Sequence, residues 1–198
     1  MEAHEATESV EHHGHGHGQG DGGFKSRAAL LVSVLAMVLA IASLGGSNAA
    51  KDATQENISA ANAYNFYQAK SIRQTAYKVA ADELEISLTK DDKLNAASKE
   101  LITKKLEAYR KNIDRYESEP ETGEGKKELM ARAKHHEAER DLALKRDPWF
   151  DYAEATLQIG IVLASVAIIT STPLLLTGSM GLGLIGLLCT LNGFLLFV

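Results

Sequence analysis

The sequence predicts an all-α membrane protein with three transmembrane helices and an extramembrane antiparallel helical hairpin, or small bundle, between the first and second spans. Charge is sorted along the chain, because residues 51–152 hold 19 of the 21 lysines and arginines and 20 of the 26 acidic residues. Residues 153–198 carry a single charge, Glu154. Three apolar runs have roughly the 20 residues that a helix needs to cross bilayer hydrocarbon. A uniform soluble globule would not separate its charges in this way.

Composition argues against several classes of function. The 198-residue chain has one cysteine, Cys189, which allows neither an internal disulfide framework nor a cysteine-based structural zinc site. Its formal net charge is -5, without the basic surplus of a nucleic-acid-binding protein, so we expect no nucleic-acid partner. Residues 181–186 match the dinucleotide fingerprint formally, but they lie inside an apolar run and follow no predicted strand. Since no nucleophile, base and orienting acid can be assembled from the spacing either, we expect neither a cofactor nor an enzyme.

Residues 1–24 are expected to form a disordered tail that is rich in histidine and acid. The segment interleaves histidine with glycine and contains no lysine or arginine. A composition so poor in apolar residues favours a solvated chain. Imidazoles on a flexible glycine chain could instead gather weakly around zinc, nickel or copper. The candidate metal ligands are His12, His13, His15 and His17.

Residues 25–46 are expected to form the first transmembrane helix. An uncharged run of 17 residues covers residues 28–44 and spans about 25 Å as a helix, near the lower limit for a hydrocarbon core of about 30 Å. A cleaved signal peptide is the competing interpretation, because residues 47–49 resemble a small-residue cleavage site. Against it, 27 residues precede the run, and the run exceeds the usual signal-peptide core of about 7–15 residues.

Residues 47–147 are rich in strong helix formers, and we expect them to form the extramembrane hairpin. One apolar seam has steps of three and four residues: Ile102, Leu106, Tyr109, Ile113 and Tyr116. An earlier, looser and alanine-rich stripe comprises Ile58, Ala61, Ala69, Ile72, Ala76, Val79 and Leu84. Thr89 and Asp92 form a capping-box pair that predicts a fresh helix start. Proline and glycine in residues 119–125 predict the loop that reverses the chain.

A hairpin with so thin an apolar seam would be marginal on its own, because each ordered residue costs about 1–2 kcal/mol of backbone entropy. Self-association is the simplest remedy, so we expect a homo-oligomer. Tyr64, Phe66 and Tyr67 crowd one region of the sequence and could supply the contact surface. The alternative is that these rings only fill a core within the chain.

Residues 148–172 and 173–198 are expected to form the second and third transmembrane helices. Asp147 can cap the second span, and Pro148 is tolerated at a first helical position. A tight turn that residues 177–179 complete should join the two spans. Three aromatic side chains at the start of the second span suit headgroup depth: Trp149, Phe150 and Tyr152.

Small residues repeat at helical spacing in every span and should let helices approach closely in lipid. The predicted helix-packing residues are Ala36, Ala40, Gly160, Ala164, Gly183 and Gly186. The repeats do not say whether the packing partner lies in the same chain or in another.

Basic residues near the span ends predict the orientation. Lys25 and Arg27 place the N-terminus in the cytoplasm by the positive-inside rule. Basic residues at the end of the hairpin favour the opposite orientation, but segments longer than about 60 residues can cross regardless of charge. We therefore expect a multi-pass protein of the bacterial inner (cytoplasmic) membrane, with residues 51–150 in the periplasm.

Three segments carry a likeness to a known family: residues 40–44, 65–72 and 132–140, with Tyr67-Gln-Ala-Lys70 as the most specific piece. On these residues the chain resembles an uncharacterised bacterial membrane-protein family, a domain of unknown function of about two hundred residues. The resemblance implies a tail rich in His and acid, a first span, a long helical excursion and a closing pair of spans. The chain departs from the family's pattern at residues 171–178, where the family has a basic loop. The resemblance implies no activity, substrate or catalytic residue.

The preferred hypothesis is a non-enzymatic, self-associating scaffold or partner-binding platform whose partners are membrane lipid and further copies of itself. A metal-responsive or metal-buffering membrane protein that uses the tail histidines is one alternative. A small channel or transporter is another, because Glu154 lies at the start of a span and intramembrane carboxylates often mark ion or proton paths.

Overall fold

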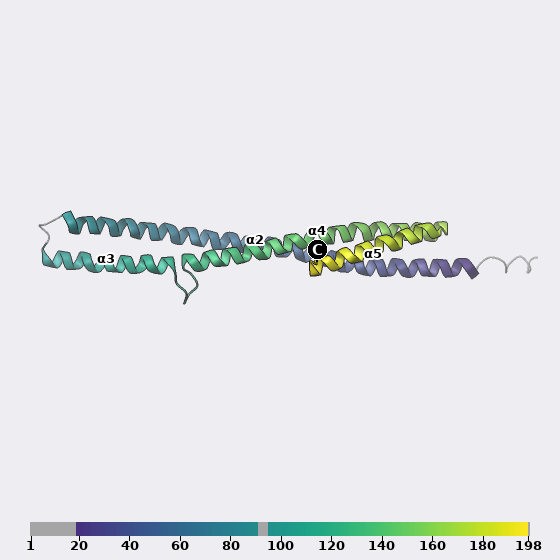
Figure 1. Cartoon of the computed structure of the whole chain (residues 1–198), viewed down its shortest axis with the longest axis horizontal. Coiled ribbons are helices and arrows are strands. Elements are labelled where there is room, and N and C mark those ends of the chain that lie inside the picture. Colours follow the sequence, from purple (N-terminus) through teal and green to yellow (C-terminus); the bar gives the residue numbers. More distant parts are fainter. Residues whose placement is uncertain (1–18, 91–94, 198) are drawn as a thin grey trace, which may run out of the picture. The chain divides into compact units, whose positions relative to one another are not determined.

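The computed structural model describes residues 19–90 and 95–197. These residues form four helices and no strand, as Figure 1 shows: α2 (Gln19–Lys90), α3 (Ala96–Glu117), α4 (Lys126–Thr170) and α5 (Pro173–Leu195). Among them, α2, α4 and α5 each contain a stretch long and apolar enough to cross a membrane. The all-α class with three candidate spans is therefore confirmed.

The chain divides into two compact units, which are described separately. The apolar unit joins Met1–Lys51 with Ala143–Val198, and the hairpin unit comprises Asp52–Leu142. Both α2 and α4 are single helices that contribute to each unit. The hairpin unit contains the middle of the chain, where most of the charge lies.

The start of α3 differs from the prediction. Thr89 lies inside α2, where its hydroxyl donates to the carbonyl oxygen of Glu85 at 3.0 Å, a local bond that satisfies it without ending the helix. Asp92 lies outside the described residues. Asn95 caps α3 instead, because its side chain accepts a hydrogen bond from the backbone N–H of Ser98 at 2.8 Å.

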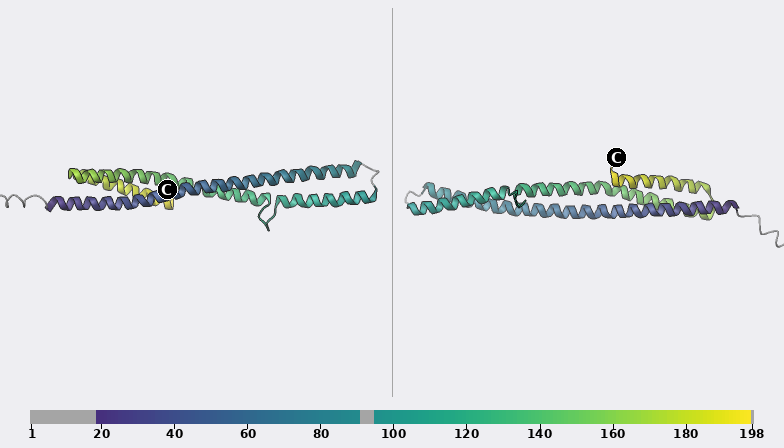
Figure 2. Two further views of the ribbon diagram at one scale, coloured as in Figure 1. Left: turned by 180° about the vertical axis from the view of Figure 1, so that it is seen from behind. Right: turned by 90° about the horizontal axis from the view of Figure 1, so that it is seen from below.

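The prediction that residues 119–125 reverse the chain is wrong, because α3 and α4 both run antiparallel to α2. Tyr77 of α2 contacts Tyr109 of α3 with ring centroids 5.3 Å apart. Farther back along α2, the hydroxyl of Tyr64 donates to Glu137 of α4 at 3.0 Å. Residue numbers therefore fall along α2 while they rise from α3 into α4. We call α3 and the part of α4 in the hairpin unit the return arm. In Figures 1 and 2 the segment between α3 and α4 protrudes sideways from this arm.

The protruding loop is closed at its neck, which explains why it does not turn the chain. Glu128, in the first turn of α4, accepts a hydrogen bond from the Ser118 hydroxyl at 2.6 Å and from the backbone N–H of Glu119 at 3.1 Å. Gly123 adopts a φ of 68°, which favours glycine, at the tip of the loop. The two ends of the loop thus stay together, and α4 continues in the direction of α3.

The inner face of α2 in the hairpin unit advances by three and four residues alternately, which is the spacing of a coiled-coil seam. Its buried and half-buried members are Ala53, Glu56, Ala60, Ala63, Tyr67, Lys70, Gln74, Tyr77, Ala81, Leu84 and Leu88. The predicted seam of α3 also faces inward, with Leu106 buried and the other four members half-buried. The looser stripe predicted on α2 lies on the opposite, exposed face, apart from Leu84. Alanine and polar contacts, rather than the larger aliphatic residues, therefore select the buried face of α2.

In the apolar unit, α4 does not begin at Asp147 and Pro148 as predicted. It passes through both residues without a break, although an internal proline removes one backbone hydrogen bond. Phe150 and Ala153, just after the proline, belong to the buried cluster of this unit and hold the helix in place. Strong helix formers before the proline also favour continuation.

The turn between α4 and α5 is shorter than predicted. Ser171 has a φ of 51°, and Thr172 precedes Pro173 at the first position of α5. Proline suits that position because its fixed φ is already helical. Residues 177–179 lie inside α5, so the turn predicted there is wrong.

Candidate functional site

Small residues mark the closest helix contacts of the apolar unit. The Ser179 hydroxyl of α5 donates to the carbonyl oxygen of Gly160 in α4 at 2.7 Å. A Cβ atom at Gly186 would lie only 2.5 Å from Cγ of Leu157, and one at Gly183 would collide with the side chain of Leu35. These contacts show where the three helices approach one another most closely.

The six predicted helix-packing residues divide into two groups. Gly160, Ala164, Gly183 and Gly186 are all buried within the unit. Ala36 and Ala40 are exposed, because Ala28, Leu35 and Ala42 form the buried face of this part of α2. These two alanines thus point away from the other described helices of the unit.

Phe150 forms the centre of the apolar unit and is 1% exposed. Its ring packs edge-to-face on Phe194 with centroids 4.9 Å apart. The absence of side chains at Gly45 and Gly193 makes room for it, since a Cβ atom at Gly193 would lie 2.7 Å from the ring. The sequence predicted headgroup depth for this ring, whereas its packing role was not predicted.

The three residues of the predicted contact surface also have different surroundings. Tyr64 donates its hydroxyl to Glu137, and this hydrogen bond raises the pKa of Tyr64. Nζ of Lys126 lies 5.5 Å from the ring centroid of Tyr67, a cation–π distance. Phe66 is half exposed, and among the three it offers the largest free apolar surface. Changes at Tyr64 or Tyr67 would disturb the hairpin itself.

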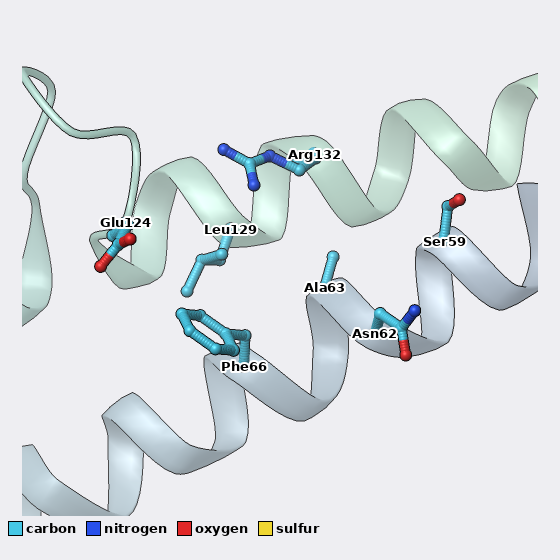
Figure 3. Close-up of a pocket in the computed structure, with 7 residues that line it drawn as sticks. All are labelled: Ser59, Asn62, Ala63, Phe66, Glu124, Leu129 and Arg132. Carbon is cyan, nitrogen blue, oxygen red and sulfur yellow. The ribbon is translucent and has the colours of Figure 1, made fainter.

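Phe66 borders an open groove of about 380 Å³ in the hairpin unit. Figure 3 shows the Leu129 side chain of α4 pointing toward the Phe66 ring of α2. Arg132 lies on the rim, where its Nη2 donates to the carbonyl oxygen of Gly123 at 3.2 Å. The groove therefore has an apolar floor and a charged rim. Its lining residues are Ser59, Asn62, Ala63, Phe66, Glu124, Leu129 and Arg132.

Beside the groove, the ends of α3 and α4 meet over Gln74, which is only 3% exposed. Nε2 of Gln74 donates to the carbonyl oxygen of Ile113 at 2.9 Å and to Oε2 of Glu117 at 3.0 Å. Nζ of Lys126 donates to Oε1 of Gln74 at 2.9 Å and to the same Glu117 oxygen at 3.2 Å. We call Lys70, Gln74, Glu117 and Lys126 the polar junction.

Lys70 is the second buried member of the polar junction on α2. Its Nζ lies 3.3 Å from Oε2 of Glu124 and 5.4 Å from the ring centroid of Tyr116. A buried ammonium needs such partners, because desolvation of an unpaired charge is very costly. The junction thus ties α2 to α3, to α4 and to the loop between them.

The carboxylates around the loop are held in their charged form. Hydrogen bonds from Gln74 and then from Lys126 lower the pKa of Glu117. The Ser118 hydroxyl and the Glu119 backbone N–H lower the pKa of Glu128. At neutral pH both groups are therefore hydrogen-bond acceptors rather than proton donors. As charged acceptors they can hold the end of α3 and the start of α4 together.

The polar junction was not predicted from the sequence, although Lys70 belongs to the segment that carries the most specific family likeness. Polar residues at three- and four-residue steps among alanines were the available signal. That pattern can be interpreted only when it is known which face of α2 packs against α3 and α4.

The remaining predicted chemistry is not brought together in the described residues. His12, His13, His15 and His17 lie outside them. Within residues 19–90 and 95–197, no group of three or more His, Cys, Asp or Glu side chains could hold a metal ion. Glu154 is half-buried in α4, near Gly46. Metal binding by the tail stays a prediction.

Comparison with known proteins finds a family model that covers most of the chain. No curated protein and no solved structure matches the chain. A family model described as Domain of unknown function (DUF4337) matches residues 24–196 and leaves out most of the histidine-rich tail. The likeness to an uncharacterised family of about two hundred residues is thereby confirmed. The chain belongs to the DUF4337 family.

Proposed function

We propose that this protein is a non-enzymatic scaffold of the bacterial inner membrane that associates with itself and presents its hairpin unit to partners. One observation carries the proposal. The outer face of α2 in the hairpin unit exposes Ile58, Ile72, Val79 and Ile86, and each side chain is more than half exposed. We call these four residues the outer stripe.

The outer stripe is unusual because the same helix buries smaller and more polar residues. Full burial of an isoleucine or valine side chain stabilises a protein by about 1.5–3 kcal/mol. The inner face of α2 instead buries alanines together with Lys70 and Gln74. Most of the large aliphatic side chains of α2 in the hairpin unit thus stay exposed in the most charged part of the chain, where an apolar row favours a protein interface.

The exposed small residues of the apolar unit support the same proposal. Ala36 and Ala40 lie on the outer face of α2 in its apolar part. Small residues allow close helix packing in lipid, where the hydrophobic effect does not drive helices together. A second chain could therefore pack along both the apolar and the polar part of α2.

Replacing Ile72 and Val79 together by serine is expected to weaken self-association by at least about tenfold, because each copy then loses two aliphatic contacts. The measurement is the mass of the full chain in detergent or lipid nanodiscs over a range of concentrations. Leu101→Ser is the matched control, since Leu101 is an exposed aliphatic residue of α3 outside the stripe. A monomeric unaltered chain, or equal masses for all variants, would refute the proposed self-association.

The proposed orientation places the N-terminus in the cytoplasm and the hairpin unit in the periplasm. Thr122 is exposed in the loop between α3 and α4. In a Cys189→Ala background, Thr122→Cys should react with a membrane-impermeant maleimide on intact spheroplasts. Ser9→Cys is the control and should react only after lysis. The reverse pattern of labelling would place the hairpin unit in the cytoplasm.

A further inference from the structure

Gln158 is an unusual side chain in the candidate span of α4. Within residues 155–171 it is the only side chain that is charged or carries an amide. It is exposed and makes no hydrogen bond to any other residue that the structure describes. The hydroxyls of Thr156, Ser165 and Thr170, in contrast, each donate to the carbonyl oxygen four residues earlier, at 2.8, 2.8 and 2.9 Å. The amide of Gln158 is therefore left without a partner in the described chain.

The position of Gln158 along α4 places its amide inside the hydrocarbon. Tyr152 is exposed and packs edge-to-face on Trp149 with ring centroids 6.2 Å apart. Such amphipathic rings favour the headgroup region. Gln158 follows Tyr152 by six residues, which is about 9 Å along a helix. Since hydrocarbon offers no water to satisfy an amide, the side chain favours a hydrogen-bond partner on another helix.

The other described helices of the apolar unit do not supply this partner. They pack on the opposite face of α4, where the Ser179 hydroxyl of α5 already donates to the carbonyl oxygen of Gly160. The amide of α5, Asn192, is buried, and its side-chain oxygen accepts from the backbone N–H of Phe197 at 2.9 Å. The partner of Gln158 therefore comes from another molecule.

The residues around Gln158 allow a second helix to approach closely. Ala155, Val162 and Ser165 lie on the same face of α4, and all three are exposed. None of them is larger than valine, and small side chains let helix backbones come close enough for hydrogen bonds between helices in lipid. The exposed face of α5 instead carries large aliphatic side chains such as Leu184 and Leu188, which suit lipid tails.

A second copy of the chain offers the matching group. A primary amide both donates and accepts hydrogen bonds, so two glutamine side chains that face each other satisfy each other. Copies inserted in one membrane with the same topology hold Gln158 at the same depth, and a twofold axis along the membrane normal brings the two side chains together. An unrelated helix would need a polar group of its own at that depth.

We propose that Gln158 forms a hydrogen bond to Gln158 of a second copy inside the membrane, with the face of α4 that carries Ala155 and Val162 as the contact surface. This inference rests on the self-association proposed above and adds a contact within the lipid. That contact lies on α4, whereas the outer stripe lies on α2. Substitutions can therefore remove either contact without touching the other.

Leu188 of α5 provides a control position at the depth of the proposed contact. Its side chain is exposed. A Cβ atom at Gly186 of α5 would lie 2.5 Å from Cγ of Leu157 in α4. Because α4 and α5 run antiparallel, Leu188 then lies at about the level of Ala155. Cysteines at these two positions therefore differ in the face they occupy rather than in depth.

Disulfide crosslinking of the full chain in native membranes tests the contact, in a Cys189→Ala background and with a lipid-soluble oxidant. Ala155→Cys should form same-position dimers with a yield several times that of Leu188→Cys, which measures random collision. Adding Gln158→Leu to the Ala155→Cys chain should lower the yield to the level of this control. Equal yields for the two cysteine positions, or an Ala155→Cys yield that survives Gln158→Leu, would overturn the inference.

Energy transfer between labelled copies of the full chain in phosphatidylcholine vesicles separates this inference from the proposed function. Gln158→Leu should weaken association about 3- to 30-fold, the range for a polar contact between membrane helices. Leucine suits a lipid-facing position, so the variant should still insert. Leu184→Ala on the exposed face of α5 is the control and should leave association unchanged. Undiminished association of Gln158→Leu would overturn this inference alone, whereas an unaltered chain that stays monomeric would overturn the proposed self-association as well.

Discussion

Phe150→Ala is expected to destabilise the apolar unit by about 3–5 kcal/mol, the usual cost of removing a fully buried phenylalanine ring. The ring fills the space that Gly45 and Gly193 leave open and packs on Phe194. The measurement is the unfolding free energy of the full chain in mixed micelles. Phe197→Ala is the matched control, because Phe197 is 59% exposed, and it should change stability by less than about 1 kcal/mol. Equal losses for the two variants would contradict a core role for Phe150.

The same contact can be tested from the glycine side. Gly193→Ala places a Cβ atom 2.7 Å from the Phe150 ring, so it should also destabilise the unit. In the double variant, the methyl group enters the cavity left by the ring. The two losses should therefore sum to more than the loss of the double variant, which is the signature of a direct contact.

Gln74→Leu is expected to open the polar junction, because Glu117 and Lys126 each lose a hydrogen-bond partner next to a new apolar side chain. Loss of such partners costs about 2–3 kcal/mol. Amide hydrogen exchange in the last turn of α3 and the first turn of α4 should then rise about 30- to 150-fold. Gln68→Leu is the matched control, since Gln68 is exposed on the same helix. Unchanged exchange at both helix ends would show that the junction does not hold them.

The sorting of charge and apolar residues was sufficient to predict the helical class and the three candidate spans. The seam of α3 was also predictable, because Leu106 and its neighbours combine large side chains with helical spacing. Local propensity failed at Pro148, where packing of Phe150 keeps α4 intact. It failed again at the loop before α4, since the bonds from Ser118 and Glu119 to Glu128 join residues about ten positions apart.

The buried face of α2 could not be predicted from hydrophobicity. The most apolar stripe of α2 contains Ile58, Ile72 and Val79, whereas α3 and α4 pack on alanines and on Gln74. Buried polar groups depend on partners that are distant in sequence, here Ile113, Glu117 and Lys126. For the same reason the aromatic cluster was identified as a unit, while the structure gives Tyr64, Phe66 and Tyr67 different roles.

The hydrogen bonds at the base of the loop between α3 and α4 make the alignment of these two helices independent of the length of the loop. Ser118, Glu119 and Glu128 fix where α4 resumes, whatever number of residues lies between them and the tip. Insertions and deletions near Thr122 can therefore accumulate without shifting α4 relative to α3. This makes the tip the natural place on the hairpin for sequence to diverge, and the natural position for an epitope tag.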